Sequence, residues 1–160
     1  MTRILFFCLG NICRSPMAEF IMKDLVEKRG LSGRYQIASA ATSDEEEGNP
    51  LYPPARRTLD LHGIPHARHA ARQLTPGDLH EYDLLIGMEA RNLQNARRLL
   101  GDSPKYRRLL DYTASPRDIA DPWYTGDFDA TYRDVATGCS ALFEHITGTP
   151  APALPGAHTR

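Results

Sequence analysis

The residues most able to do chemistry lie together near the start of the chain, where Cys8, Arg14 and Ser15 form a Cys-x5-Arg-Ser motif followed by Pro16. A thiolate is a strong nucleophile. The planar guanidinium of Arg can bind two phosphate oxygens at once, and the intervening main-chain N–H groups can bind others. The motif therefore predicts a loop that holds a phosphoryl group and attacks its phosphorus. The alternative is that Cys8 is an inert thiol in the core.

The segments on either side of the motif predict the elements that position it. Residues 4–7 are a continuous hydrophobic run, as in a strand buried on both faces of a parallel sheet. Pro16 suits the first turn of a helix, and Gly30 suits its end. Between them, apolar residues recur at helical spacing: Ala18, Ile21, Met22, Leu25 and Val26. A strand end, a tight loop and a helix N-terminus should therefore meet at Cys8.

The rest of the chain predicts alternating strands and helices. Strands are expected at 35–41, 82–87 and 106–110, and helices at 53–63, 89–100 and 128–146. This order predicts a single α/β domain at 1–147, with a four-stranded parallel sheet flanked by helices on both faces and the phosphate-binding loop after the first strand. Residues 148–160 are rich in Pro, Ala and Gly without periodicity, and they predict a flexible C-terminal tail.

Composition argues against several classes of partner. The 160 residues carry 19 basic and 20 acidic side chains, a formal net charge of −1, so we expect no nucleic acid or membrane partner. No apolar stretch has the length of a membrane span or of a signal peptide core. The three Cys residues form no disulfide framework, and a nucleophilic thiol needs a reducing compartment. We therefore expect a cytoplasmic protein.

A second segment, Asp121-Pro122-Trp123-Tyr124, lies near the C-terminal end of the predicted domain. Together with the N-terminal motif, it closely resembles the low-molecular-weight protein tyrosine phosphatases. The resemblance covers residues 2–146 and includes shorter matches at 39–41, 71–74 and 88–93. It implies a protein-tyrosine-phosphatase that acts on phosphotyrosine-containing proteins, passes through a phosphocysteine intermediate and releases inorganic phosphate. It also implies that no cofactor or metal takes part.

The resemblance assigns three catalytic residues. Cys8 is the expected nucleophile, because a thiolate is stabilised at a helix N-terminus beside a guanidinium. Arg14 is the expected phosphate clamp. Asp121 is the expected general acid and then general base, and Pro122 favours an extended backbone at Asp121. Without the Cys8 loop, an Asp-Pro pair would more often be a plain turn.

Further residues are expected to bind the substrate or to support the loop. Ser15 can donate to the Cys8 thiolate or merely cap the helix, and Asn11 tolerates a left-handed backbone. Cys13 either pairs with Cys8 in a reversible disulfide, as in the family, or packs under the loop. Trp123 and Tyr124 are expected to wall the pocket. The substrate-binding set is Leu9, Gly10, Asn11, Ile12, Cys13, Ser15, Trp123 and Tyr124.

The resemblance also predicts that Ser39 and His69 surround Asn11. The match at His69 needs a one-residue shift, and a lone His is more often a surface residue. Elsewhere in the family an aromatic residue often forms the pocket wall opposite Trp123. The matching residue here is Glu45, inside an acidic run at 44–47. This departure predicts a negative pocket mouth that tolerates acidic residues beside phosphotyrosine poorly.

Three alternatives compete with this interpretation. Thioredoxin-linked arsenate reductases share the loop, but they need additional Cys residues in a region, 38–138, that here has none. Phosphoarginine phosphatases of the family carry Thr where this chain has Ile12, whose apolar side chain favours a flat aromatic ring. A non-catalytic phosphate-binding module would lack a nucleophile or an acid, yet Cys8, Arg14 and Asp121 are all present.

Overall fold

The computed structural model describes residues 1–154, in which four parallel strands form one sheet in the order β2-β1-β3-β4. The strands are β1 (Thr2–Cys8), β2 (Tyr35–Ala41), β3 (Leu84–Gly87) and β4 (Tyr106–Arg108). The helices are α1 (Arg14–Lys28), α2 (Pro53–Leu61), α3 (Pro76–Glu81), α4 (Ala90–Leu100), α5 (Pro122–Thr125) and α6 (Phe128–Thr147). This confirms the predicted α/β fold.

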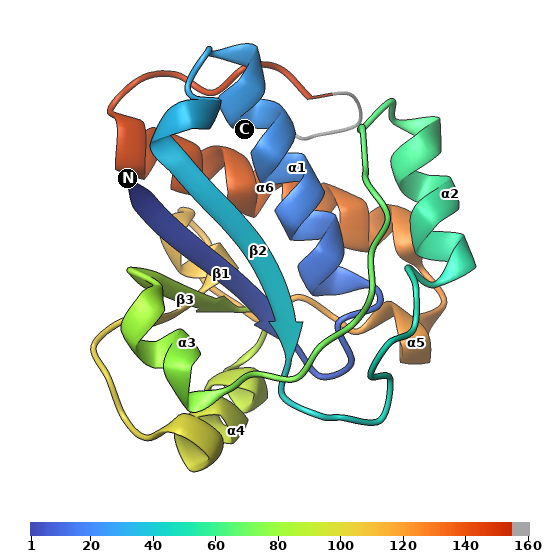
Figure 1. Cartoon of the computed structure of the whole chain (residues 1–160). Helices are drawn as coiled ribbons and strands as arrows, with labels where there is room; N and C mark the ends of the chain where they lie inside the picture. The colour runs from blue at the N-terminus through green and yellow to red at the C-terminus, as the bar shows by residue number, and fades with distance from the viewer. Residues whose placement is uncertain (155–160) are drawn as a thin grey trace.

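Helices cover both faces of the sheet, and the side chains of β1 alternate between them. Ile4 and Phe6 belong to a large core cluster with residues of α1, α2 and α6. Leu5 and Phe7 belong to a smaller cluster on the other face with residues of α4. In Figure 1, α1, α2 and α6 accordingly lie on one side of the sheet, and α3 and α4 on the other. The continuous apolar run in the sequence is explained by burial on both faces.

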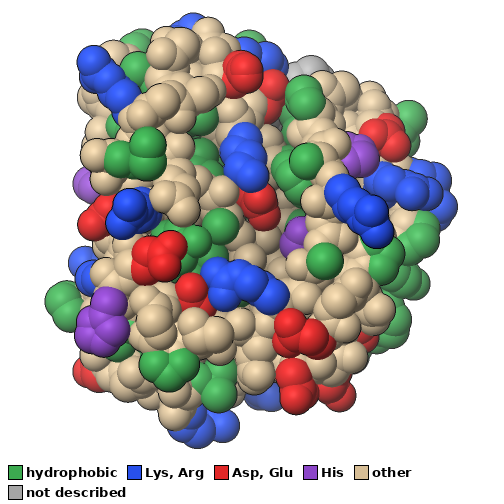
Figure 2. Space-filling model, viewed as in Figure 1, with side chains coloured by type: hydrophobic (Ala, Val, Ile, Leu, Met, Phe, Trp, Pro, Cys, Tyr) green, Lys and Arg blue, Asp and Glu red, His purple; other side chains and the backbone are tan. Residues whose placement is uncertain are grey.

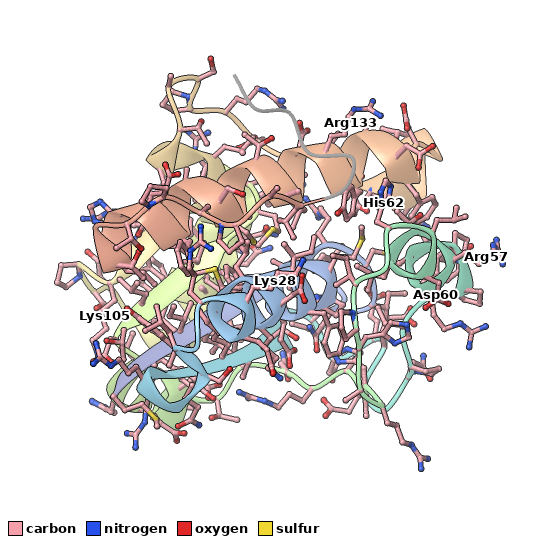
Figure 3. All side chains as sticks on the ribbon, turned by 90° about the horizontal axis from the view of Figure 1, so that it is seen from above. Lys28, Arg57, Asp60, His62, Lys105 and Arg133 are labelled. Atoms are coloured by element: carbon pink, nitrogen blue, oxygen red, sulfur yellow. The ribbon has the colours of Figure 1, made fainter. Side chains whose placement is uncertain are left out.

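Helices α1 and α6 pack side by side over the sheet (Figure 3). At the end of α2, the ring of His62 stacks on Tyr132 of α6, with 3.8 Å between ring centroids and 4° between ring planes. This contact holds the C-terminal end of α2 against α6. On most of the face shown in Figure 2, acidic and basic side chains are interspersed, and a group of acidic side chains lies at the lower right. None of the helices within residues 1–154 is long and apolar enough to cross a membrane.

Three short elements differ from the sequence expectation. Helix α3 was not expected, because its six residues are too few to show a hydrophobic period; Pro76 in its first turn and a capping box between Thr75 and Asp78 start it locally. Strand β4 ends at Arg108, and a 3-10 helix (Leu109–Tyr112) follows where strand was expected. A short apolar run does not distinguish these two states. Helix α5 was also not expected as a helix.

Residues 149–154, the described part of the chain after α6, form no helix or strand, but they are anchored by hydrogen bonds. Arg29 Nη2 donates to the Pro150 carbonyl oxygen at 3.1 Å, and the Ala151 N–H donates to Glu144 Oε2 at 3.0 Å. Leu154 is buried. Residues 149–154 of the predicted tail thus make defined contacts with α1 and α6, and the remainder of that tail, 155–160, lies outside the described residues.

The register of the sheet brings three strand ends to one edge. Cys8 pairs with Ala41 of β2, and the preceding Phe7 pairs with Gly87 of β3. The chain after β1 then passes through residues 9–13 into the N-terminus of α1. In Figure 1, α5 lies close to this edge. The segments that follow β1, β2 and β3 and the segment at α5 therefore meet around Cys8. Ligands of open parallel sheets bind at such a place, outside the carboxyl ends of the strands.

Candidate active site

A cavity of about 300 Å³ opens at the end of β1, and it contains almost all of the predicted site. It is lined by Cys8, Leu9, Gly10, Asn11, Ile12, Cys13, Arg14, Glu45, Glu46, Asp121, Trp123 and Tyr124. Among the described residues, no acceptor is found for the main-chain N–H groups of residues 9–13. Main-chain N–H groups at a buried site require a partner. The loop is therefore built to receive an anion with several oxygens.

Ser15 lies beneath the loop and connects Cys8 to Asn11. Its Oγ is 3.0 Å from Cys8 Sγ and accepts a hydrogen bond from Asn11 Nδ2 at 2.8 Å. Because Asn11 is the donor in the second contact, the hydroxyl hydrogen of Ser15 can point either at the sulfur, 3.0 Å away, or at the Ala40 carbonyl oxygen, 3.4 Å away. The arrangement can therefore stabilise a thiolate at Cys8. Ser15 makes this contact from the first turn of α1, below the cavity lining.

Asn11 adopts the left-handed backbone that its residue type allows, with φ at 59°. Two neighbours hold it there. His69 Nε2 is 2.7 Å from the Asn11 carbonyl oxygen, so this nitrogen carries the hydrogen and donates. The Arg72 N–H donates to Asn11 Oδ1 at 3.3 Å. The hydroxyl of Ser39, which was expected to lie around Asn11, donates to Glu19 Oε1 at 2.6 Å, so the hydrogen bond recorded for it leads to α1.

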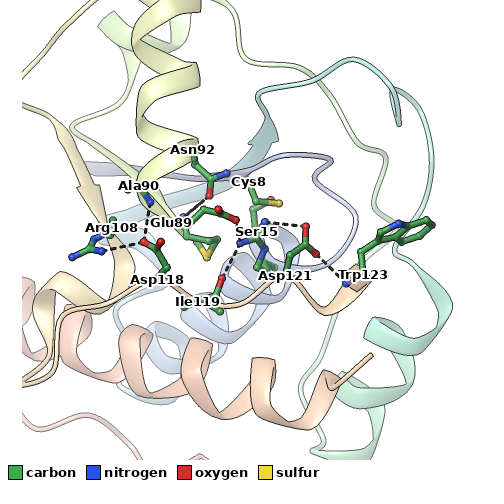
Figure 4. Close-up of polar contacts among 12 residues, drawn as sticks. Cys8, Ser15, Glu89, Ala90, Asn92, Arg108, Asp118, Ile119, Asp121 and Trp123 are labelled. Carbon is green, nitrogen blue, oxygen red and sulfur yellow. Dashed lines mark hydrogen bonds and ion pairs between the residues drawn. The ribbon is translucent and has the colours of Figure 1, made fainter. Parts of the chain in front are cut away.

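Arg14 is almost completely buried, with 1 % of its surface exposed. Its Nη1 donates to Glu89 Oε2 at 2.6 Å and to the Ile119 carbonyl oxygen at 2.9 Å, while Nη2 donates to Asp121 Oδ2 at 3.2 Å (Figure 4). Burial alone lowers the pKa of Arg14, but the negative charges of Cys8, Asp121 and Glu89 outweigh it, so the pKa is raised. The guanidinium is therefore held in one orientation beside Cys8.

Glu89 is a site residue that the sequence did not reveal. It directly precedes α4 and follows the end of β3, which is paired with β1. An acidic residue just past the carboxyl end of the neighbouring strand is the one signal that points to it. In the sequence, the segment around it stands out only as a match to the family.

Asp121 presents its carboxylate to the cavity from the N-terminus of α5. Its backbone is extended, at φ −77° and ψ 116°, as Pro122 predicts. One oxygen, Oδ1, accepts from the Trp123 N–H at 3.0 Å and caps α5, and the other faces Arg14. The two oxygens therefore have separate partners, since Oδ1 caps α5 and Oδ2 contacts Arg14.

Cys13 lies in the same loop as Cys8 but in a different electrostatic position. Burial raises the pKa of its thiol to about 12, and the negative charges of Cys8, Asp121 and Glu46 contribute to the increase. Cys13 therefore stays protonated at neutral pH, and it does not compete as a nucleophile. All three cysteines are free thiols in the structure. Burial likewise raises the pKa of the core residue Cys139.

Aromatic side chains form part of the cavity wall. Trp123 and Tyr124 both line it and are 55 % and 78 % exposed, so they stand at its mouth. The ring of Tyr52 lies 5.0 Å from that of Trp123 and 6.0 Å from that of Phe128. Tyr52 was not predicted as a supporting residue. No group of three or more His, Cys, Asp or Glu side chains within residues 1–154 is placed to hold a metal ion.

Replacing Glu89 should impair the site through Arg14. We expect Glu89→Gln to lower kcat/KM for p-nitrophenyl phosphate about tenfold, because a charged partner of the guanidinium becomes neutral. Asp118→Asn is the matched control. Asp118 forms an ion pair with Arg108 and accepts a hydrogen bond from the Ala90 N–H at the start of α4, but it does not contact Arg14. Unchanged kinetics in Glu89→Gln, or an equal loss in the control, would contradict this role.

A buried thiol and guanidinium in a loop of free N–H groups, between a parallel strand and a helix N-terminus, define a phosphate-binding site in a protein of the α/β class. The comparison with known proteins is more specific. A family model described as "Low molecular weight phosphotyrosine protein phosphatase" matches residues 3–150. The chain belongs to this family of protein-tyrosine-phosphatases.

Individual relatives agree with this assignment over nearly the whole chain. The chain is 39 % identical to the low molecular weight protein-tyrosine-phosphatase YfkJ of Bacillus subtilis, covering 91 % of this chain and 96 % of YfkJ. It is 36 % identical to the phosphotyrosine protein phosphatase of Rattus norvegicus, covering 88 % and 93 % of the two chains. The crystal structure of YfkJ superposes with a TM-score of 0.89, covering 92 % and 96 %.

The fold by itself leaves the substrate open within this family. The crystal structure of DARP, a Drosophila arginine phosphatase, superposes with a TM-score of 0.81 at 27 % identity, covering 92 % of this chain and 98 % of that one. Discrimination between phosphorylated side chains must therefore come from residues around the cavity.

Proposed function

We propose that Cys8, Arg14 and Asp121 hydrolyse phosphotyrosine in proteins through a phosphocysteine intermediate. The observation that carries the proposal is the set of free N–H groups of residues 9–13, which surround the buried pair of Cys8 and Arg14. Residues 1–147 contain all the groups involved, and we propose them as the catalytic domain. Because the nucleophile is a thiol, we place the enzyme in the reducing cytoplasm.

In the first step, the phosphate oxygens bind the free N–H groups, and Arg14 Nη2 turns from Asp121 Oδ2 to a phosphate oxygen. Glu89 and the Ile119 carbonyl keep Nη1 in place during this exchange. The Cys8 thiolate attacks phosphorus, and the bond to the phenolic oxygen breaks as Asp121 donates its proton to that oxygen. The products are tyrosine and phosphocysteine.

In the second step, Asp121 is a carboxylate and accepts a proton from a water molecule. The resulting hydroxide equivalent attacks phosphorus, the bond to sulfur breaks, and the sulfur leaves as the thiolate that Ser15 can stabilise. Inorganic phosphate is released. The same N–H groups and Arg14 bind the three equatorial oxygens in both transition states.

The cavity wall supports phosphotyrosine as the preferred substrate. Trp123 and Tyr124 stand at the mouth, and the branched side chain of Ile12 lies within the cavity. Such groups contact a flat aromatic ring favourably. A phosphoserine side chain is shorter, so a peptide would have to enter the mouth before its phosphate reached the loop. Ile12 offers no hydrogen bond to the guanidinium of phosphoarginine.

A panel of substrates tests this proposal directly. One peptide scaffold carries phosphotyrosine, phosphoserine or phosphoarginine, and the phosphate released is measured for each. We expect kcat/KM for phosphotyrosine to exceed that for the other two by about a hundredfold or more, a ratio that contacts with a large side chain can supply. Vanadate should inhibit as a mimic of the five-coordinate phosphorus. Faster hydrolysis of phosphoarginine or phosphoserine would overturn the substrate assignment.

A further inference from the structure

We propose that Glu45 and Glu46, which we call the acidic rim, select substrates that carry Lys or Arg beside the phosphotyrosine. The proposal rests on the proposed function, since the rim lines the same cavity as Cys8 and Arg14. Both residues lie in the loop between β2 and α2. In Figure 2, acidic side chains gather at the lower right, where Figure 1 places this loop.

The side chain of Glu46 lies directly over the phosphate-binding loop. Its Cγ is 3.3 Å from the position that a Cβ on Gly10 would occupy, and Glu46 is only partly exposed. Its Oε1 accepts a hydrogen bond from Asn49 Nδ2 at 2.8 Å, which fixes the carboxylate. Glu45 is exposed, with Oε1 at 3.3 Å from Ser43 Oγ. One carboxylate is therefore held near the loop, and the other stands further out.

These two carboxylates line the cavity without a cationic partner of their own. Glu89 and Asp121 are paired with Arg14. In contrast, neither Glu45 nor Glu46 forms an ion pair with any residue in the described part of the chain. Carboxylates beside a site for a phosphate dianion repel it and weaken binding. A cation supplied by the substrate would remove this repulsion and add an attraction.

The substrate residues next to phosphotyrosine are the ones that can supply this cation. The phosphate occupies the loop, and the ring lies against Trp123, Tyr124 and Ile12, so the peptide backbone remains at the mouth. Adjacent Cα atoms are about 3.8 Å apart, and a Lys or Arg side chain can reach several ångströms beyond its own Cα. A neighbouring Glu would instead be placed beside two like charges. The rim thus acts on specificity and takes no part in the chemical steps.

The test compares peptides that differ only beside the phosphotyrosine, with Lys, Gln or Glu on each side in turn. For the wild-type enzyme at low salt, we expect kcat/KM to be about threefold to tenfold higher with Lys than with Glu, as exposed charge pairs allow. The ratio should shrink towards one as ionic strength rises, because salt screens exposed charges. All values are normalised to kcat/KM for p-nitrophenyl phosphate, which has no flanking residues.

Two variants assign the preference to the rim. Glu45→Gln together with Glu46→Gln should reduce the Lys-to-Glu ratio to within about twofold of one, and Glu45→Gln alone should reduce it partly. Asp44→Asn is the matched control, because it removes one charge from the same acidic run but lies outside the cavity lining. It should keep most of the preference.

The outcomes separate this proposal from the function on which it rests. If the wild-type enzyme hydrolysed neither p-nitrophenyl phosphate nor phosphotyrosine peptides, that result would contradict the proposed function itself. Normal hydrolysis without a preference for Lys would overturn only the role of the rim. The role of the rim would also be overturned if the double variant Glu45→Gln/Glu46→Gln kept the preference for Lys, or if Asp44→Asn removed this preference to the same extent as the double variant. If the double variant does not fold, Glu45→Gln and the salt dependence of the wild-type ratio decide whether the rim selects the substrate.

Discussion

Cys8→Ser is expected to abolish turnover, lowering kcat for p-nitrophenyl phosphate by about 10⁵-fold or more, as removal of a nucleophile does in other covalent enzymes. The serine hydroxyl has nearly the same shape, but it is not ionised at neutral pH and does not attack phosphorus. The free N–H groups of the loop and Arg14 remain in place. Phosphate should therefore still bind, and calorimetric titration with inorganic phosphate measures this separately from catalysis.

Cys13→Ser is the matched comparison, because it makes the same change five residues along the same loop. The pKa of Cys13 is raised to about 12, so its thiol has no nucleophilic role at neutral pH. We expect this variant to keep kcat within about tenfold of the wild type, since only packing under the loop changes. If Cys8→Ser retained turnover, or if Cys13→Ser lost it to the same extent, the nucleophile would be wrongly assigned.

Asp121→Asn should have the second largest effect, and the effect should depend on the leaving group. We expect kcat for a phosphotyrosine peptide to fall by about 10²- to 10⁴-fold, because tyrosine leaves poorly without a proton. The loss with p-nitrophenyl phosphate should be smaller, since p-nitrophenolate leaves easily as an anion. Asn retains an oxygen that can accept from the Trp123 N–H, so the cap of α5 is preserved.

The leaving-group comparison distinguishes proton donation from a structural role. A misplaced loop would slow both substrates equally, and such a result would contradict the assignment of Asp121 as the general acid. Asp127→Asn provides the control. Asp127 caps α6 by accepting from the Ala130 N–H at 2.9 Å, and Asn is an equally good cap. This variant should keep the activity of the wild type with both substrates.

Local sequence was sufficient wherever neighbouring residues determine the structure. The run at 4–7, the Cys-x5-Arg-Ser motif and Pro16 lie in one continuous segment, so a strand, a loop and a helix start follow from residue types alone. The left-handed Asn11 follows in the same way. Asp121, 107 residues from Arg14, was assigned only through the resemblance to a family. No periodicity or spacing connects two residues at that separation.

Tertiary structure alone decided which distant side chains meet. The parallel register of β1 and β3 carries Glu89 to Arg14 across 75 residues. The fold also turned Ser39 to Glu19, whereas the position of His69 beside Asn11 was expected only through the resemblance. Such contacts depend on strand order and helix packing, which sum many weak interactions over the whole chain. The sequence therefore determined the reacting groups. The packing of the sheet decided which neighbouring residues hold these groups in place and stabilise their charges.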